Sequence, residues 1–498
     1  MHRVLAMEQE EGNMLEILKK EAIRTLTENG AETYATTTDC CLDLFSTIGA
    51  LRNAESKEIM NRFIRAFAED RTTALRIAFF ARDIRGGLGE RRVFRVILKY
   101  LALSYPQTMH KNLRLVPEYG RWDDLMELMN TPCEQEMMRF VQEQLQRDMK
   151  ALESHEHVSL LGKWLPSVNA TNPQTLRMGK CVARALGLSD AAYRKALSSL
   201  RAQIGIVENN LRERDYTFDY VIQPSRALFK YRKAFENHDH DRYHAFLNEV
   251  AQGKISMHTG ALYPYELILP LLSEDCTDEA AAPIEVTWNA LPDYTDGRNA
   301  LVVVDGSGSM YVDVKPMPAT IALSLGLYFA QRNSGAFRNH FITFSQRPQL
   351  VEIKGKTLLD QVRHCMSYNE IANTNMEAVF RLILDTAVHN GLKQKDLPET
   401  LYIVSDMEFD DCADGAETTN FENAKALFEA EGYRLPTVVF WNVASRRLQQ
   451  PVTKNEQGVA LVSGASPHLF EMVMGGRVNP YTFMIDTISS KRYTPVEA

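Results

Sequence analysis

The chain has 498 residues, of which 45% are hydrophobic and 24% are charged, a composition typical of a globular protein rather than a disordered or fibrous one. One hydrophobic core rarely covers such a length, so we expect more than one domain. The net charge of −8 excludes a polycation, so any site for nucleic acid must be a local basic surface.

The seven cysteines are scattered without a Cys-x-x-Cys pair, which favours reduced thiols in a cytosolic compartment over a disulfide framework. The tandem pair Cys40-Cys41 lies in an apolar stretch, and we interpret it as core packing. No apolar run approaches the length of a membrane span, and the first residues lack an uninterrupted hydrophobic signal core. We therefore expect a cytoplasmic protein that does not associate with membranes.

Hydrophobic residues recur at helical spacing through most of residues 1–280, with short connections and no clear strand. The first predicted helix covers Met14–Thr27, and later ones include Cys133–Ser154, Pro173–Leu186 and Ala191–Asn209. Helices that follow one another in this way often form a solenoid or a curved bundle, so we predict a HEAT-like or solenoid domain. The sequence shows no strict period, so repeats are an inference only.

The composition changes near residues 277–284, where Ala280-Ala281-Ala282-Pro283 is interpreted as a connector. We therefore predict a helical domain over residues 1–284 and a second domain over residues 285–498. Strands and helices alternate in the second domain, a pattern that predicts a doubly wound, mostly parallel sheet. The main predicted elements are a strand ending at Asp305, a helix over Ala319–Gln331, and strands over His340–Phe344, Leu401–Val404, Thr437–Trp441 and Val459–Val462.

An unbroken apolar run, Leu301–Val304, ends in Asp305 and is followed by a loop with alternating glycines and serines. Such a run is typical of a buried strand in a parallel sheet. Asp305 would then lie on the carboxyl edge of the sheet, where open α/β sheets bind ligands. The glycines let the loop turn tightly, so Asp305, Ser307 and Ser309 can point to one place. A carboxylate with hydroxyls is a hard oxygen set that suits Mg²⁺ or Mn²⁺ better than zinc or copper.

The pattern Asp-x-Ser-x-Ser after a buried strand resembles the metal-ion-dependent adhesion site of von Willebrand factor A domains, which have a Rossmann-like fold. In that family a Thr from a second loop and an Asp from a third complete the site. Thr374 precedes a predicted helix, and Asp406 ends the strand Leu401–Val404. The resemblance thus implies one Mg²⁺ held by Asp305, Ser307, Ser309, Thr374 and Asp406. It also implies an open metal position that accepts an acidic group from a protein partner.

Three segments of the helical part, residues 82–92, 117–124 and 260–266, resemble the TROVE superfamily of Ro ribonucleoprotein-like proteins. They are most similar to uncharacterised relatives in which a helical half precedes a von Willebrand A domain. Ro autoantigens themselves form a ring of helical repeats closed by the A domain. The resemblance implies binding of RNA, either small structured RNAs or the single-stranded ends of misfolded ones.

Local charge agrees with such a partner, since residues 163–233 hold 13 Lys and Arg against 5 Asp and Glu. Cations supply sequence-independent affinity for phosphates, and aromatics among them fit the stacking of single-stranded bases. These residues are equally well explained as solvated helix faces and core aromatics, and both interpretations stay open. In residues 51–100, with 12 basic and 6 acidic residues, Arg82, Arg85, Arg91 and Arg92 are interpreted as structural. The candidate RNA-binding residues are Lys180, Arg184, Lys195 and Arg201.

The run His238-Asp239-His240-Asp241 precedes His244, which follows His240 by one helical turn. That spacing places two imidazoles on one helix face, as a zinc site requires. No cysteine or further histidine is near, and Asp-His-Asp runs are common at exposed helix starts. We therefore favour an exposed helix start over a metal site.

Enzymatic activity is not expected. The sequence contains neither a phosphate loop of the Gly-x4-Gly-Lys-Ser type nor a Gly-x-Ser-x-Gly elbow. Ser307 and Ser309 have no nearby histidine in sequence, and Glu408 is better explained as tuning the ion than as a general base. Two hypotheses result: a cytoplasmic RNA-binding scaffold of the TROVE type, and a metal-dependent protein-interaction adaptor without a role in RNA binding.

Overall fold

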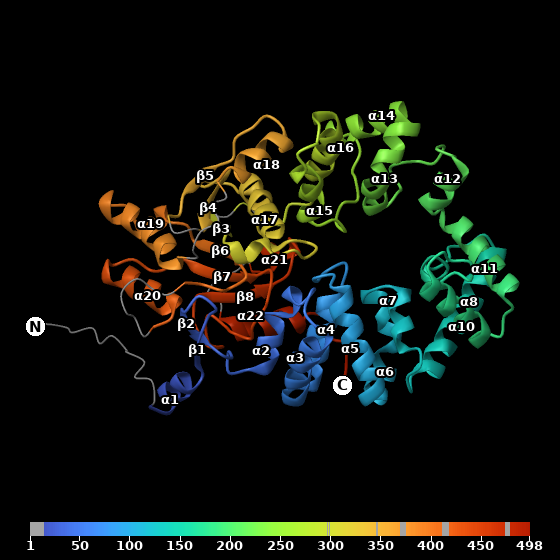
Figure 1. The fold of residues 1–498 in the computed structure, drawn as a ribbon, viewed down its shortest axis with the longest axis horizontal. Coiled ribbons are helices and arrows are strands. Elements are labelled where there is room, and N and C mark those ends of the chain that lie inside the picture. The colour runs from blue at the N-terminus through green and yellow to red at the C-terminus, as the bar shows by residue number, and fades with distance from the viewer. Residues whose placement is uncertain are drawn as a thin grey trace, which may run out of the picture.

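The chain folds into a helical part and an α/β part, in a computed structural model that describes residues 14–295, 297, 299–344, 347–368, 375–410, 418–473 and 479–498. Helices follow one another up to residue 289, and a six-stranded sheet follows from residue 300. In Figure 1 the helices lead away from the sheet, turn at α10 and α11, and return to it at α15 and α16. The prediction of an α plus α/β chain is confirmed, whereas HEAT-like or solenoid repeats stay a prediction.

The helical part consists of helices joined by short connections. Their bounds are α2 (Cys40–Phe45), α3 (Ser56–Glu69), α4 (Arg71–Arg82), α5 (Arg91–Ser104), α6 (Pro106–Asn112), α7 (Val116–Tyr119), α8 (Glu134–Glu153), α9 (Leu161–Trp164), α10 (Pro173–Ala185), α11 (Asp190–Ile204), α12 (Val207–Glu213), α13 (Ser225–His238), α14 (His240–Ala251), α15 (Pro264–Ile268) and α16 (Asp278–Asn289). Short polar residues mark several boundaries. Asp70 ends α3 and caps α4, because its carboxylate accepts a hydrogen bond from the Thr73 N–H at 3.0 Å. Nowhere in the described residues is a helix at once long and apolar enough to cross a membrane.

The N-terminal segment departs from the prediction of helices without strands. Its elements are α1 (Met14–Ala22), β1 (Arg24–Leu26) and β2 (Glu32–Tyr34), the two strands forming an antiparallel hairpin. The predicted helix Met14–Thr27 is therefore too long. Tyr34 and Gln450 exchange backbone N–H···O bonds of 3.1 and 2.7 Å, so the hairpin also pairs with the C-terminal part. Strands of three residues carry too little periodicity to be recognised, and their partner is remote in sequence.

The α/β part is built on β3 (Ala300–Asp305), β4 (His340–Phe344), β5 (Leu350–Glu352), β6 (Thr400–Ser405), β7 (Thr437–Asn442) and β8 (Val459–Ser463). Their order in the sheet is β5-β4-β3-β6-β7-β8, and only the β4–β5 pair is antiparallel. Counted along the chain this is the order 3-2-1-4-5-6 of doubly wound folds, in which the direction of winding reverses between the first and fourth strands. That switch point lies here between β3 and β6. The predicted mostly parallel, doubly wound sheet is confirmed.

Helices cover both faces of this sheet because successive residues of each buried strand point to opposite sides. The helices are α17 (Pro318–Arg332), α18 (Leu358–Met366), α19 (Met376–His389), α20 (Asn420–Ala430), α21 (His468–Met472) and α22 (Pro480–Ile488). Val302 and Val304 face the core shared with α17, α21 and the helical part, whereas Leu301 and Val303 face α19 and α20. One apolar core therefore runs from the helical part to one face of the sheet.

The predicted connector Ala280–Pro283 is wrong, because these residues lie inside α16. Alanine has the highest helix propensity, and the Thr277 hydroxyl caps the helix by accepting the Ala280 N–H at 3.3 Å. The predicted boundary between residues 284 and 285 thus falls within a helix, and the division into domains stays a prediction.

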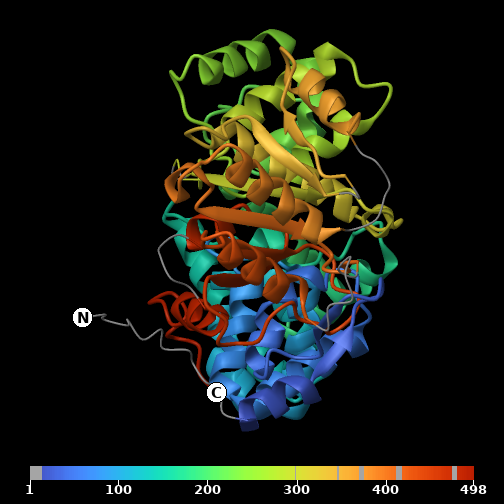
Figure 2. The same cartoon turned by 90° about the vertical axis from the view of Figure 1, so that its left-hand side faces the viewer.

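Each end of the chain packs against the part of the molecule to which the other end belongs. The N-terminal hairpin lies against the α/β part, and residues after α22 return to the helical part, where the Tyr493 hydroxyl donates to Asp83 Oδ2 at 2.9 Å. Figure 2 shows the blue N-terminal elements beside the red C-terminal ones. Each part therefore holds a segment of the other in place.

Candidate metal centre

Asp305 is the last residue of β3, and its side chain is buried at the carboxyl edge of the sheet. The register of β3 on β6 sets Val304 beside Val404, which brings Asp305 next to Ser405. Asp305 Oδ2 accepts a hydrogen bond of 2.6 Å from the Ser405 hydroxyl, and Oδ1 accepts one of 2.8 Å from the Ser307 N–H. The carboxylate is thus fixed in direction at the switch point.

Ser307 and Ser309 follow in the loop that enters a short 3₁₀ turn, η5 (Gly308–Tyr311). Their hydroxyl oxygens lie 3.0 Å apart. Two neighbouring ligands of an octahedral Mg²⁺ with bonds of about 2.0–2.1 Å are separated by about 2.9 Å. The spacing of the two hydroxyls therefore matches one edge of a magnesium octahedron.

Asp406 follows β6 directly, and its side chain is fully buried. Its Oδ1 accepts the Glu408 N–H at 3.2 Å, and its Oδ2 accepts the Arg446 guanidinium at 2.8 Å. Arg446 also pairs with Glu28 at 3.0 Å. Asp406 therefore faces the switch point beside a protein cation.

Two buried carboxyls, those of Asp305 and Asp406, share this edge of the sheet. Burial, and after it the neighbouring charge of Asp406, raises the pKa of Asp305 to about 7. Burial likewise raises the pKa of Glu408. The Arg446 guanidinium pairs with Asp406, and a divalent cation bound beside Asp305 would favour its ionised form.

The structure brings together four of the five residues predicted to bind the metal: Asp305, Ser307, Ser309 and Asp406. The fifth, Thr374, lies outside the described residues. Metal binding itself stays a prediction. Glu408, which the sequence placed beside the ion, uses Oε2 to accept the Glu28 N–H at 2.7 Å and so also contacts the N-terminal hairpin.

Sequence reasoning missed two residues of this site. Ser405 could have been found, since it stands between a buried strand and the conspicuous Asp406. Arg446 gave no such signal, because it lies in a loop after β7 and reaches Asp406 only through the fold.

A cavity of about 510 Å³ adjoins the site between the two parts of the chain. Ser309 and Arg446 line it from the α/β part, and Arg52, Glu58 and Glu90 line it from the helical part. Arg52 and Glu90 form an ion pair of 2.6 Å across its helical wall. A group that reaches Ser309 through this cavity would therefore contact both parts.

The three segments that resemble the TROVE superfamily meet in a buried polar network. The Arg82 guanidinium, 2% exposed, pairs with the fully buried Asp124 at 2.8 Å. The Tyr263 hydroxyl donates to the Leu88 carbonyl at 3.0 Å, which joins the third segment to the first. Arg85 and Arg92 donate to backbone carbonyls of residues 118 and 54. The buried pairing of Arg82 supports a structural role for this residue, whereas Arg85 and Arg92 are exposed, and their structural role stays a prediction.

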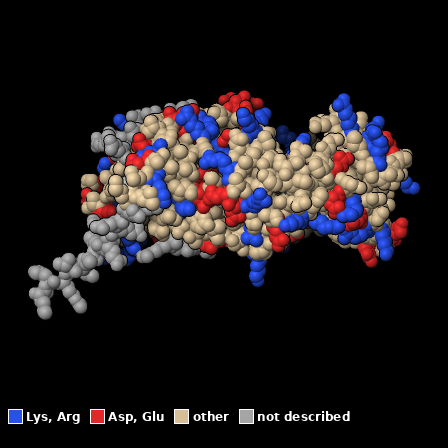
Figure 3. Space-filling model, turned by 90° about the horizontal axis from the view of Figure 1, so that it is seen from below, with Lys and Arg blue, Asp and Glu red and all other residues tan. Residues whose placement is uncertain are grey.

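The four candidate RNA-binding residues lie on α10 and α11 but differ in environment. Lys180, Arg184 and Lys195 are exposed. Arg201 is half-buried, and its guanidinium donates to the carbonyls of Gly162 and Leu165 at 2.9 and 3.0 Å. Arg201 therefore holds the loop before α10. Figure 3 shows Lys and Arg interleaved with Asp and Glu at the end of the molecule that contains these helices.

The aromatic residues of the same segment are not freely exposed. Tyr193 and Tyr220 are buried, and the others are half-buried. The full set is Tyr193, Tyr216, Phe218, Tyr220, Phe229 and Tyr231. Tyr220 packs against Phe218, Phe235 and Phe246 in a satellite core. In this structure they act mainly as core residues.

Two family models match this chain, and the descriptions of both give no function. Residues 27–140 and 135–293, together more than half of the chain, match a family model described as Domain of unknown function (DUF2828). Residues 299–488 match a Domain of unknown function (DUF7788). An uncharacterised protein of Acanthamoeba polyphaga mimivirus is 29% identical over 516 residues, covering 95% of this chain and 88% of that protein. The crystal structure of the Deinococcus radiodurans RO (RSR) protein covers 92% of this chain and 94% of its own, at 12% identity and a TM-score of 0.34. A likeness of that degree supports no conclusion.

Proposed function

The chain belongs to the family described as Domain of unknown function (DUF2828), and we propose that it is a non-enzymatic cytoplasmic scaffold that holds Mg²⁺ and binds RNA. The proposed binding of Mg²⁺ rests on the set of candidate oxygen ligands at the switch point of the sheet. Resemblance to von Willebrand A domains and to the TROVE superfamily supports the same interpretation. The six described cysteines are free thiols, which is in keeping with a reducing compartment.

The donor set fits Mg²⁺, or Mn²⁺, because every candidate ligand atom is a carboxylate or hydroxyl oxygen. Asp305, Ser307, Ser309 and Asp406 would hold the ion, with Thr374 as the fifth candidate. When bound, the ion supplies a positive centre with an open coordination position for an acidic group of a partner protein. Arg446 is the cation that pairs with Asp406, and the cavity between the two parts admits the partner's side chain.

Catalysis is not part of the proposal. Within the described residues, the hydroxyls of Ser307 and Ser309 hydrogen-bond to each other, and the Ser307 N–H donates to Asp305. Neither hydroxyl meets a histidine that could act as a general base. We therefore assign the site to binding.

Calorimetric titration of the chelator-treated full chain with Mg²⁺ or Mn²⁺ tests the metal site. We expect one ion on the wild type and at least about tenfold weaker binding by Asp305→Ala, because a ligand and a charge are lost. Arg446→Met should bind the ion more tightly, since it removes the cation beside Asp406. Arg447→Met is the matched control, because Arg447 is 54% exposed and pairs with Glu28 at 3.8 Å rather than with the buried Asp406. Folded wild type that takes up neither ion, or Asp305→Ala that binds equally well, contradicts the proposal.

RNA binding rests on the exposed cations of α10 and α11 and on the TROVE resemblance. Because phosphate contacts make affinity depend on salt, the dependence itself is diagnostic. A triple variant, Lys180→Glu, Arg184→Glu and Lys195→Glu, should bind a mixed single-stranded RNA pool more weakly. It should also reduce the magnitude of the salt slope by about 2. Arg201 is left unchanged because it holds a loop.

A second triple variant, Lys354→Glu, Lys393→Glu and Lys395→Glu, changes charge equally at exposed positions of the α/β part. It should bind the RNA pool nearly as well as the wild type. Equal affinity and salt slope for both triple variants would show that α10 and α11 do not carry the RNA.

The metal-dependent adaptor without RNA binding remains a second candidate. It is favoured by the burial of the aromatic residues and by the structural role of Arg201, which remove expected RNA contacts. Nuclease treatment separates the candidates. Purified chain that carries no nucleic acid and does not shift the RNA pool at low salt, yet binds Mg²⁺, supports the adaptor.

A further inference from the structure

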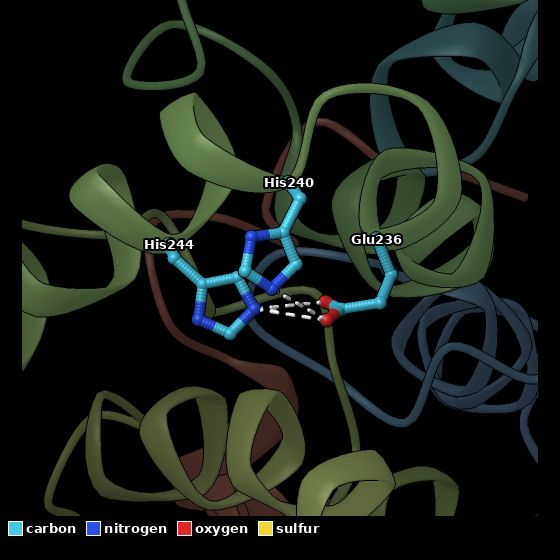
Figure 4. A group of neighbouring side chains, drawn as sticks. All are labelled: Glu236, His240 and His244. Atoms are coloured by element: carbon cyan, nitrogen blue, oxygen red, sulfur yellow. Dashed lines mark hydrogen bonds and ion pairs between the residues drawn. The ribbon is translucent and has the colours of Figure 1, made fainter.

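Three potential metal ligands outside the proposed magnesium site converge on one point at the junction of α13 and α14. The carboxylate of Glu236 and the imidazoles of His240 and His244 all have ligand atoms within 4.8 Å of one another. Figure 4 shows both histidines turned toward the carboxylate. We propose that these residues bind a divalent transition ion of the zinc type.

The convergence depends on a bend in the chain. Glu236 and His244 are eight residues apart, which corresponds to about 12 Å along a straight helix. Here α13 ends at His238 and α14 begins at His240, with Asp239 between them. The bend brings Glu236 Oε1 to 2.9 Å from His244 Nε2 and 3.5 Å from His240 Nε2. Two ligands of a tetrahedral zinc with bonds of about 2.0–2.1 Å are separated by about 3.3–3.4 Å, so only small movements are needed.

The two imidazoles lie side by side. His240 and His244 are one turn apart on α14, and their ring centroids lie 4.1 Å apart with an interplanar angle of 26°. The His240 Nδ1 lies 3.3 Å from Asp241 Oδ1. A proton on Nδ1 shared with Asp241 leaves the Nε2 lone pair available on the side of Glu236. Metal-binding histidines commonly have such a carboxylate partner on the other nitrogen.

Contacts of the surrounding core hold the bend in shape. The Tyr220 hydroxyl donates to Asp239 Oδ2 at 2.8 Å, and Arg242 pairs with the same carboxylate at 3.1 Å. Arg242 also donates to the Phe218 carbonyl at 2.8 Å. The three ligands therefore need little ordering when an ion binds, which lowers the entropic cost of binding.

Two imidazoles and one carboxylate are the protein ligands of an open zinc site, in which water or a bound molecule takes the fourth position. Imidazole favours zinc, cobalt, nickel and copper over magnesium. The side chains of His244 and Glu236 are 37% and 36% exposed, so an ion can reach them from solvent. The sequence alone favoured an exposed helix start over a metal site. Only the bend between α13 and α14 brings Glu236 close to the two histidines, and local sequence does not show it.

Zinc titration of the chelator-treated full chain, in excess Mg²⁺ to occupy the other proposed site, tests this inference. The double variant His240→Ala, His244→Ala should lose one bound zinc, and Glu236→Gln should bind it about 10–100-fold more weakly. His238→Ala is the matched control, since His238 lies in the same segment but contacts Tyr216. Cys276→Ser is a second control, because its thiol lines the same cavity as Glu236 and could bind zinc. Both controls should behave as the wild type.

Copper spectroscopy gives an independent measurement. Hyperfine splitting from two ring nitrogens is expected in the wild type and should be absent from the double variant. Unchanged zinc stoichiometry in the double variant overturns the proposal, as does equal loss in His238→Ala. A spectrum that depends on Cys276 would also overturn it, because the ion would then be held by the thiol.

Discussion

The buried carboxyl of Asp305 is a stability problem that a bound cation would relieve. Burial and the charge of Asp406 raise its pKa to about 7, against an ordinary value of about 3.9. Between these pH values the folded metal-free chain holds a proton that the unfolded chain has released. The contribution of this Asp305 proton to the free energy of unfolding is therefore complete below a pH of about 4. It is lost as the pH rises through about 7.

This pH dependence of stability predicts how Asp305→Asn differs from the wild type. The substitution keeps the shape of the side chain without its charge. In chelator the variant should already be more stable than the wild type near pH 5, by about 1.5 kcal/mol, because the unfolded wild type has released its proton there. At pH 8 it should be more stable, by at most about 4 kcal/mol. Urea unfolding of both proteins at the two pH values measures the difference. Parallel stability profiles would show that Asp305 keeps its charge without cost.

At the scale of elements, the loop between α4 and α5 joins the segments that resemble the TROVE superfamily. A Cβ on Gly87 would overlap the Phe80 carbonyl oxygen, and one on Gly89 would overlap the Tyr263 hydroxyl. Gly89 also has a φ of +67°, which favours glycine. The glycines of this motif are thus explained by close packing.

The ion pairs around this loop are buried, so breaking one should be costly. Asp124→Asn leaves Arg82 buried without its full counter-charge, and we expect a loss of about 3–5 kcal/mol in the free energy of unfolding. Glu127→Gln is the control, since Glu127 is 32% exposed and pairs with Arg95 at 3.7 Å. Denaturant unfolding measures both. An equal, small effect in the two variants would mean that the network contributes little.

For the molecule as a whole, contacts between the two parts are as close as those within them. Arg62 on α3 is 3% exposed and donates to the Ser445 hydroxyl at 2.7 Å. The Gly49 N–H donates to the Ser463 hydroxyl at 3.0 Å, at the end of β8. A Cβ on Gly49 would overlap the Ser463 carbonyl oxygen. The cavity beside the proposed metal site is therefore bounded by an interface that leaves no room for a methyl group at this point.

Gly49→Ala should separate the parts locally and lower the free energy of unfolding by about 1–3 kcal/mol. It should also weaken Mg²⁺ binding if the site depends on the closed interface. Gly260→Ala is the matched control, because no atom lies within 4 Å of the added Cβ and its φ is not positive. Thermal unfolding with and without Mg²⁺ measures both effects. Wild-type stability in Gly49→Ala would show that the interface is loose.

Local sequence by itself determined the strands of the six-stranded sheet, the longer helices and the candidate oxygen ligands at the carboxyl edge. The run ending at Asp305 is apolar at every position because its strand is buried on both faces. Asp406 follows a strand of the same kind, and parallel neighbours bring their ends together. These features depend on residues close in sequence, so periodicity and apolar runs are enough to find them.

Tertiary structure alone decided which groups surround those ligands. Arg446 reaches Asp406, Arg201 turns inward to backbone carbonyls, and Glu236 meets His244 across a bend. Nothing in the local pattern distinguishes these side chains from solvated ones. Long polar side chains take their partners from whatever the fold brings within reach, and that depends on packing between segments far apart in the chain.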